Sequence, residues 1–235
     1  MWTLIQGASR GLGRELVHQL HARGDQVIAT CRDPAGADLG VPTIPLDVTD
    51  EASIEAAAAA VAEHTERLHL LMNVAGVLHG DGFGPERRLA EVAPDNLARA
   101  FAVNASGPLL VAKHFARFLQ HDERAVLANV SARVGSISDD RLGGWYAYRA
   151  SKAAQNLFTK NLSIELTRRF ETLVVIALHP GTVDTDLSAP FQRSVKPEKL
   201  FSVERAARQF LNIVDRVGPK DNGRFIAWDG ATIPW

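Results

Sequence analysis

A glycine-rich segment directly follows a short apolar stretch at the start of the chain. Thr3-Leu4-Ile5 runs into Gly7-Ala8-Ser9-Arg10-Gly11-Leu12-Gly13, and apolar residues then recur at helical spacing until Gly24. A strand, a glycine turn and a helix in this order suit a phosphate site, because glycines let the backbone approach a pyrophosphate and the helix N-terminus supplies N–H groups. A tight structural turn is the alternative, and the spacing is G-x-x-x-G-x-G rather than the commoner dinucleotide fingerprint. The strand-loop-helix context favours cofactor binding.

Apolar, strand-like stretches alternate with helical stretches along the rest of the chain. Strands are predicted at residues 3–5, 26–31, 43–46, 68–72, 125–130, 173–178 and 224–227, with helices between them, among them 94–118 with a kink at Pro108 and 203–217. The alternation predicts one α/β domain over residues 1–235, a Rossmann-like doubly wound parallel sheet with strand order 3-2-1-4-5-6-7 and helices on both faces. Ligands of such sheets bind beyond the carboxyl ends of the strands.

Charge and cysteine content limit the class of protein. The 26 basic and 27 acidic residues are interspersed and give a formal net charge of -1, which favours neither nucleic acid nor an anionic membrane surface as a partner. Cys31 is the only cysteine and cannot form an internal disulfide, and no apolar run reaches membrane-spanning length. We expect a cytoplasmic protein. We expect no metal site, because the histidines lack metal-ligand spacing.

The residues after the second predicted strand bear on the choice of dinucleotide. An NAD site usually has a carboxylate there for the ribose 2'-hydroxyl, whereas an NADP site needs a cation for the 2'-phosphate. Arg32 occupies this place, and Arg10 lies in the glycine loop. Two guanidiniums suit bidentate phosphate binding. Asp33 offers an alternative, in which it pairs with Arg32 at the surface, but the sequence favours NADP(H) over NAD(H).

Tyr148 and Lys152 are four residues apart near the start of a predicted helix and therefore share one face. A free tyrosine with a pKa near 10 is a poor acid at neutral pH, and a fixed cation beside it stabilises the phenolate. An isolated Tyr-x-x-x-Lys is more often an ordinary pair on an amphipathic helix. The other motifs of the chain therefore decide between the two explanations.

Taken together, these motifs resemble the short-chain dehydrogenase/reductase (SDR) family over essentially the whole chain. The resemblance rests on Gly7, Gly11 and Gly13, on Asp47, Asn73-Val74-Ala75-Gly76 and Asn104, and on Tyr148 with Lys152 and Pro180-Gly181. The segments around Ser131 and Tyr148, and Trp228-Asp229-Gly230, are similar to a narrower group. That group includes C-factor-like bacterial proteins and sniffer-type carbonyl reductases.

The resemblance implies a role for each matching residue. Tyr148 would protonate a carbonyl oxygen while the nicotinamide delivers hydride, Lys152 would lower the tyrosine pKa and hold the nicotinamide ribose, and Asn104 would anchor a water. The implied cofactor-binding residues are Gly7, Ser9, Arg10, Gly11, Leu12, Gly13, Arg32, Asp47, Val48, Asn73, Ala75, Gly76, Tyr148, Lys152, Pro180, Gly181, Val183 and Thr185.

One position departs from the family pattern. The family normally has a serine, which polarises the substrate carbonyl, three residues before the glycine that is here Gly135, and this chain has Ala132 there. Ser131 is the candidate substitute, although adjacent strand residues point to opposite faces. Whether Ser131, Ser136 or neither replaces the missing hydroxyl stays open. The loss of such a donor costs about 10²- to 10³-fold in rate.

The leading interpretation is an NADP-dependent carbonyl reductase or alcohol dehydrogenase that acts on a small, fairly apolar carbonyl or alcohol. The alternative is a C-factor-like signalling protein that binds NAD(P) with little or no turnover, an idea motivated by Ala132. The family commonly pairs through the helices that here span about 94–118 and 147–168. We therefore expect a homodimer or homotetramer.

Overall fold

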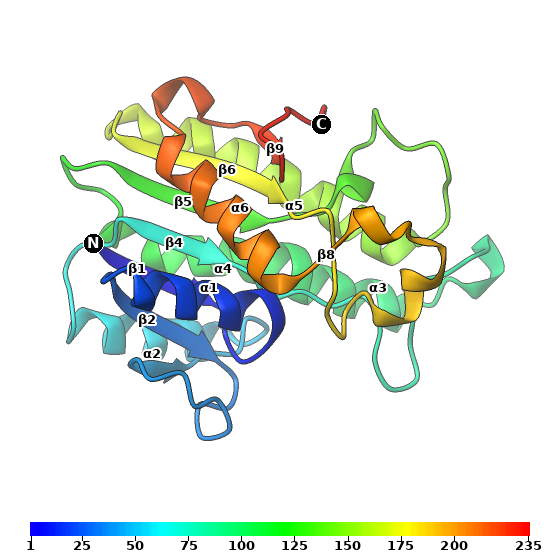
Figure 1. Ribbon diagram of the computed structural model, residues 1–235, viewed down its shortest axis with the longest axis horizontal. Coiled ribbons are helices and arrows are strands. Elements are labelled where there is room, and N and C mark those ends of the chain that lie inside the picture. Colours follow the sequence, from blue (N-terminus) through cyan, green and yellow to red (C-terminus); the bar gives the residue numbers. More distant parts are fainter.

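A parallel sheet of seven strands forms the centre of the computed structural model, which describes residues 1–235 apart from the side chain of Ser194 (Figure 1). The strands are β1 (Trp2–Gln6), β2 (Gln26–Cys31), β3 (Thr43–Pro45), β4 (Leu70–Asn73), β5 (Ala125–Val130), β6 (Leu173–His179) and β9 (Phe225–Ala227). Their order is β3-β2-β1-β4-β5-β6-β9, which confirms the predicted order with β9 as the seventh strand. Two short strands, β7 (Thr182–Val183) and β8 (Leu200–Phe201), pair separately and were not predicted.

Six α-helices cover both faces of the sheet, as expected for a doubly wound fold. They are α1 (Gly11–Ala22), α2 (Glu51–Ala62), α3 (Pro94–Phe101), α4 (Gly107–Phe115), α5 (Tyr146–Glu165) and α6 (Val203–Arg216). Neighbouring strand residues alternate between the faces, so Ile5 packs with α1 and α6 while Leu4 packs with α2 and α4. Because both faces are covered, β5 is buried along its whole length and is apolar except for Asn129.

Helix α2 starts directly after Asp50, which caps it. The carboxylate of Asp50 accepts a hydrogen bond from the backbone N–H of Ala52 at 3.0 Å and so satisfies one of the free donors at the helix start. The small residues Ala57 and Ala58 then pack against the sheet with Ile54 and Val61. The alanine run is therefore ordinary helix packing.

The helix predicted over residues 94–118 is not continuous. It consists of α3, a π-helical turn over Ala102–Ser106, α4 and a 3-10 turn over Ala116–Phe118. The prediction of a kink at Pro108 is wrong. Pro108 lies in the first turn of α4, where its missing N–H costs little, and not in a helix interior. The irregularity is instead the π turn, and π turns are frequent at functional sites.

The loops that follow β4, β5 and β6 all leave the same edge of the sheet, on the right in Figure 1. Parallel strands bring their carboxyl ends to one edge, so chain segments far apart in sequence meet there. In the described part of the chain, no helix combines the length and the apolar character that crossing a membrane requires.

Candidate active site

The predicted site residues lie along the carboxyl edge of the sheet. Those of the first half follow β1 (Gly7, Ser9, Arg10, Gly11, Leu12, Gly13), β2 (Arg32), β3 (Asp47, Val48) and β4 (Asn73 at its end, Ala75, Gly76). Those of the second half lie in the π turn (Asn104), after β5 (Ser131), in the first two turns of α5 (Tyr148, Lys152) and after β6 (Pro180, Gly181, Val183, Thr185). The fold thus gathers them at one edge.

The glycine loop is packed too closely for side chains. Gly7 has a φ of +85°, and a Cβ added to it would lie 2.6 Å from the backbone nitrogen of Ala75. A Cβ on Gly13 would lie 2.2 Å from the carbonyl oxygen of Gly7. At the start of α1, Arg10 makes no side-chain cap and the first turn has no acidic residue. The first N–H groups of this helix are therefore open to an anion, which fits a dinucleotide pyrophosphate.

Arg32 lies directly after β2 and is exposed to solvent. The alternative in which Asp33 pairs with Arg32 is not seen. The Asp33 carboxylate instead accepts a hydrogen bond from the backbone N–H of Ala35 at 3.1 Å. Nearby, hydrogen bonds from the Thr49 side chain and backbone lower the pKa of Asp47, with a smaller contribution from the Arg32 charge. The Arg32 guanidinium therefore has no ion pair within the described side chains.

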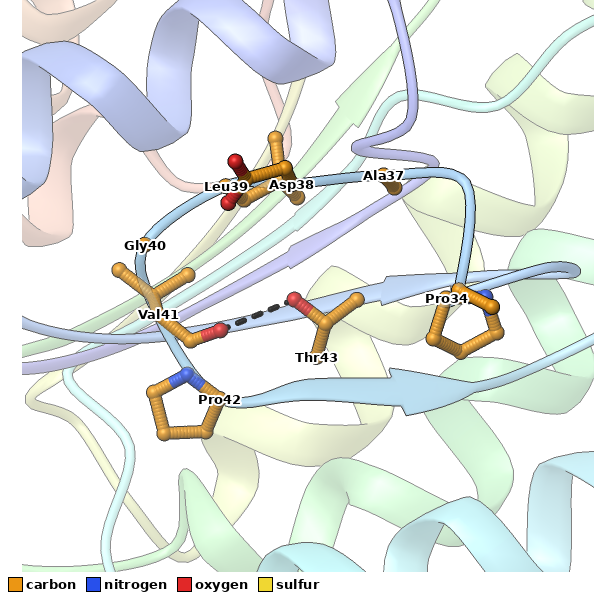
Figure 2. A pocket seen from close by; sticks show the side chains of 9 residues that line it. Pro34, Ala37, Asp38, Leu39, Gly40, Val41, Pro42 and Thr43 are labelled. Atoms are coloured by element: carbon orange, nitrogen blue, oxygen red, sulfur yellow. Dashed lines mark hydrogen bonds between the residues drawn. The ribbon is translucent and has the colours of Figure 1, made fainter.

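A hollow of about 580 Å³ lies in the loop between β2 and β3 (Figure 2). Residues 34–43 form it, with the Thr43 hydroxyl donating to the carbonyl oxygen of Val41 at 3.0 Å. Its only ionisable lining side chain is Asp38. This hollow therefore lacks the polar groups that a catalytic centre requires.

Tyr148 and Lys152 lie one helical turn apart on α5, with the Lys152 nitrogen 6.0 Å from the centre of the tyrosine ring. The buried ammonium donates to the carbonyl oxygen of Val130 and to Oε1 of Gln155, each at 2.9 Å. An ammonium has three N–H donors, so one remains for another group. Neither acceptor carries a charge, and the positive charge is therefore not neutralised by a buried carboxylate.

Burial decides the pKa of both groups. It lowers the pKa of Lys152 to about 7 and raises the pKa of Tyr148 to about 12. Burial is the cause of both shifts, and the lowering of the tyrosine pKa by the lysine charge stays a prediction. A lysine that is partly neutral near pH 7 provides less positive charge to a phenolate.

Asn104 is fully buried and joins the π turn to the loop after β4. Its Oδ1 accepts from the backbone N–H of Val77 at 2.8 Å, and its Nδ2 donates to the Val77 carbonyl at 2.9 Å and to the Ser151 hydroxyl at 3.1 Å. A Cβ on Gly76 would lie 3.4 Å from Asn104 Oδ1 and 3.7 Å from Lys152 Nζ. The absence of a side chain at Gly76 therefore keeps the space beside both polar groups open.

Both serines near Ala132 use their hydroxyl protons elsewhere. Ser131 is buried and donates to Oδ1 of Asn156 at 2.6 Å, which ties the end of β5 to α5. Ser136 donates to the carbonyl oxygen of Pro234 at 2.6 Å. A hydroxyl has a single proton, so in this arrangement neither serine donates to a substrate carbonyl.

Glu86 holds the start of α5, and no sequence pattern predicted this role. Its backbone carbonyl accepts from the N–H of Trp145 at 2.5 Å, and its Oε2 accepts from the N–H of Ala147 at 3.1 Å. Trp145 precedes the helix with a φ of +50° and makes no side-chain cap, so the buried carboxylate acts as the cap. Glu86 comes from a loop without periodicity, whereas Gln155 was detectable from its spacing of three residues after Lys152.

The comparisons with known proteins agree with this arrangement. The family described as short chain dehydrogenase matches residues 1–196, which is most of the chain. The protein belongs to the short-chain dehydrogenase/reductase family. Its members include 1-hydroxy-2-glutathionyl-2-methyl-3-butene dehydrogenase of a Rhodococcus species, which is 35% identical over 99% of this chain and 98% of that protein.

Two further SDR relatives bear on function. The NADPH-bound carbonyl reductase from chicken fatty liver superposes with a TM-score of 0.87 and 30% identity, over 99% of this chain and 98% of that chain. C-signal of Myxococcus xanthus is 34% identical over 73% of this chain and 95% of its own length. The SDR chain described here is thus similar both to a carbonyl reductase and to a protein named as a signal, as its sequence suggests.

Proposed function

We propose that this SDR protein is an NADP(H)-dependent oxidoreductase that interconverts a carbonyl compound and an alcohol, with Tyr148 as the general acid and base. The observation that supports this best is the placement of Tyr148 one turn before a buried Lys152 at the carboxyl edge of the sheet. The relative bound to NADPH is named a carbonyl reductase, which supports the same reaction class.

Several features fit a bound nicotinamide dinucleotide. The open N-terminus of α1 would hold the pyrophosphate, and the space beside Gly76 would receive the ribose next to Lys152. When bound, the cofactor would supply or accept the hydride. Lys152 would donate its remaining N–H to the ribose and its charge would stabilise the Tyr148 phenolate, while Asn104 would keep the loop at Val77 in place.

Arg32 and Arg10 support a preference for NADP(H). Arg32 is exposed and free of an ion pair to Asp33, so its guanidinium is available to a 2'-phosphate. Arg10 is 77% exposed and its only ion pair is a 3.5 Å contact with Asp186, which is also exposed. Such an exposed pair is weak and does not prevent phosphate binding.

The two tyrosines of the chain provide a matched test. Purified protein would be assayed for NADPH oxidation with a panel of ketones and aldehydes. Removal of a general acid by Tyr148→Phe is expected to lower kcat by about 10²- to 10⁴-fold. Tyr146→Phe removes a hydroxyl from the same helix at a 40% exposed residue and should leave kcat unchanged. Equal rates for wild type and Tyr148→Phe would refute the assignment.

A second candidate function is a dinucleotide-binding signalling protein with little turnover. Two observations favour it: Ala132 removes the usual hydroxyl, and the hydroxyls of Ser131 and Ser136 donate elsewhere. Similarity to C-signal points the same way. This candidate predicts tight NADPH binding by calorimetry with no oxidation by any carbonyl tested. Ala132→Ser would then restore turnover by about 10²- to 10³-fold if the missing donor is the cause.

We also propose that the protein forms a homodimer or homotetramer through α5 and the neighbouring helices. Leu157 is 58% exposed and Ile164 is 49% exposed, seven residues further along the same helix. Two turns separate them, so both lie on one face and form an apolar strip on the outside of α5.

A further inference from the structure

We propose that the pocket beside Tyr148 accepts carbonyl or alcohol substrates that carry a carboxylate group in addition to an apolar body. The inference rests on the proposed function and specifies its substrate class. The pocket has a volume of about 910 Å³ and is formed by the loop after β4, by the segment between β7 and β8 and by Trp145, the residue before α5. This volume is near the upper end of the range for small-molecule sites, so it admits compounds larger than a small ketone.

An aromatic wall connects this pocket to the tyrosine. The ring of Trp145 lies 6.2 Å from the ring of Tyr148, edge to face, and 4.9 Å from the ring of Phe191. Phe191 in turn lies 5.8 Å from the ring of His79. A substrate whose carbonyl reaches Tyr148 would therefore place its apolar body against Trp145 and Phe191.

The polar lining of the pocket is cationic. Arg87 and Arg193 line it, and no aspartate or glutamate does. Both arginines are exposed, and neither guanidinium has an ion pair or a hydrogen bond with another described side chain. By contrast, the guanidinium of Arg88 pairs with Glu91 at 3.0 Å. Positive charge at the pocket is therefore left without an ion-pair partner among the described side chains.

The nearby carboxylates are engaged by other groups. Glu91 accepts from the backbone N–H of Arg87 at 2.8 Å and from the Arg88 side chain at 3.0 Å. The carboxylate of Glu86 is buried, and its Oε2 accepts from the helix N–H of Ala147, so it faces the helix start. The Nε2 atom of His79 is 3.1 Å from the backbone carbonyl oxygen of Asp186, so this hydrogen bond occupies one of the two ring nitrogens. A carboxylate suits the two arginines, because a guanidinium binds both of its oxygens in a fork.

The size of the effect follows from the exposure of these arginines. An exposed pair contributes about 0.2–1 kcal/mol, which corresponds to roughly 1.4- to 5-fold in affinity for each guanidinium. Two guanidiniums acting on one carboxylate would therefore change the specificity constant by about 2- to 25-fold. The effect should fall as salt is raised, since exposed charges are screened.

Matched substrates and variants test the proposal. The kcat/KM values for 4-acetylbenzoate and for the neutral 4-acetylbenzamide would be compared in wild type, in the double variant Arg87→Gln/Arg193→Gln and in Arg88→Gln. The double variant is expected to lose about 2- to 25-fold for the carboxylate and nothing for the amide, whereas Arg88→Gln should lose nothing for either. An equal loss for both substrates, or no loss for the carboxylate, would overturn the proposal.

A binding measurement separates this proposal from the proposed function. Calorimetry would follow 4-acetylbenzoate binding to the protein saturated with NADP⁺, in wild type and in the double variant. Arginine-dependent binding without turnover of either ketone would support the anion site and refute the reductase. If instead the amide is turned over, and neither binding nor turnover of the carboxylate depends on the arginines, the reductase is supported and the anion site is refuted.

Discussion

The side-chain oxygen of Gln155 accepts a hydrogen bond from the ammonium of Lys152 at 2.9 Å, one turn further along α5. An acceptor for an ammonium favours the charged form and so opposes the burial that lowers the pKa of Lys152 to about 7. We expect Gln155→Leu to lower this pKa further and to reduce kcat/KM roughly tenfold at pH 7, since a hydrogen bond to a charged group contributes about 1.5–3 kcal/mol. The loss should be smaller at pH 6.

The shift in the lysine pKa is measured from the pH dependence of kcat/KM in wild type and in Gln155→Leu. Gln155→Glu is the variant to compare with Gln155→Leu. A carboxylate at this position would raise the lysine pKa and shift the profile in the opposite direction. If both variants keep the profile of the wild type, Gln155 has a purely structural role.

Glu86 is expected to affect stability and turnover together, because its carboxylate caps the helix on which Tyr148 lies. Glu86→Ala should lower the free energy of unfolding by about 1–2 kcal/mol and kcat several-fold. Glu86→Gln keeps an oxygen acceptor and should lose less. Urea unfolding and steady-state kinetics measure the two quantities. Glu91→Ala, at an exposed carboxylate of the same loop, is the control and should change kcat little.

Arg32 provides a test of cofactor choice. Arg32→Asp should raise the Kd for NADPH by about 10- to 100-fold and leave the Kd for NADH nearly unchanged, because only NADPH has a 2'-phosphate to repel. Fluorescence titration with each cofactor measures this. Arg14→Gln, which removes an exposed guanidinium bound to the carbonyl oxygen of Asp38, should change neither value. Equal effects of Arg32→Asp on both cofactors would remove the argument for NADP(H).

Burial of Lys152 should make the cofactor-free protein more stable at alkaline pH. The folded pKa is about 7 and the ordinary value is 10.5, so between these values the folded state binds fewer protons than the unfolded state. Stability therefore rises as pH rises through this window, by at most about 1.4 kcal/mol per pH unit. The free energy of unfolding in urea would be measured for wild type and for Lys152→Met between pH 7 and pH 9. The difference between the two proteins at each pH isolates the contribution of Lys152. A pH-independent difference would contradict it.

The apolar strip on α5 predicts the effect of a charge at the proposed interface. Leu157→Arg should shift the sedimentation coefficient at micromolar concentration to that of a monomer, because a buried unpaired guanidinium is costly. Leu142→Arg changes a residue that is 89% exposed but lies outside α5 and should leave the assembly intact. A wild-type monomer at micromolar concentration would exclude the proposed association.

The strands, the glycine loop and a helix start at Asp50 have signatures in residues close in sequence, whereas the order of the strands joins distant segments and follows from the doubly wound fold that their alternation indicates. Glycine spacing, apolar periodicity and a capping aspartate have direct local signatures. The contacts of Ser131 with Asn156 and of Glu86 with Ala147 could not be predicted. They join segments 25 and 61 residues apart, and only the packed fold decides which partner a hydroxyl or carboxylate meets.

The pKa of Tyr148 shows a second limit of the sequence. Four-residue spacing correctly places the lysine beside the tyrosine, but spacing says nothing about burial, and burial raises the pKa of Tyr148 to about 12. The sequence also did not predict the π turn, because no residue type marks an i→i+5 hydrogen bond. Pro108 instead predicted a kink two residues after this turn.

The π turn at Ala102–Ser106 joins two helices that pack on different neighbours. Before it, α3 packs on α5, which holds Tyr148; after it, α4 packs on α2 as well as on α5. Deleting a single residue there would rotate one half by about 100° against the other and turn Asn104 away from Val77. The length of this segment is therefore constrained by the position that Asn104 must keep beside Val77.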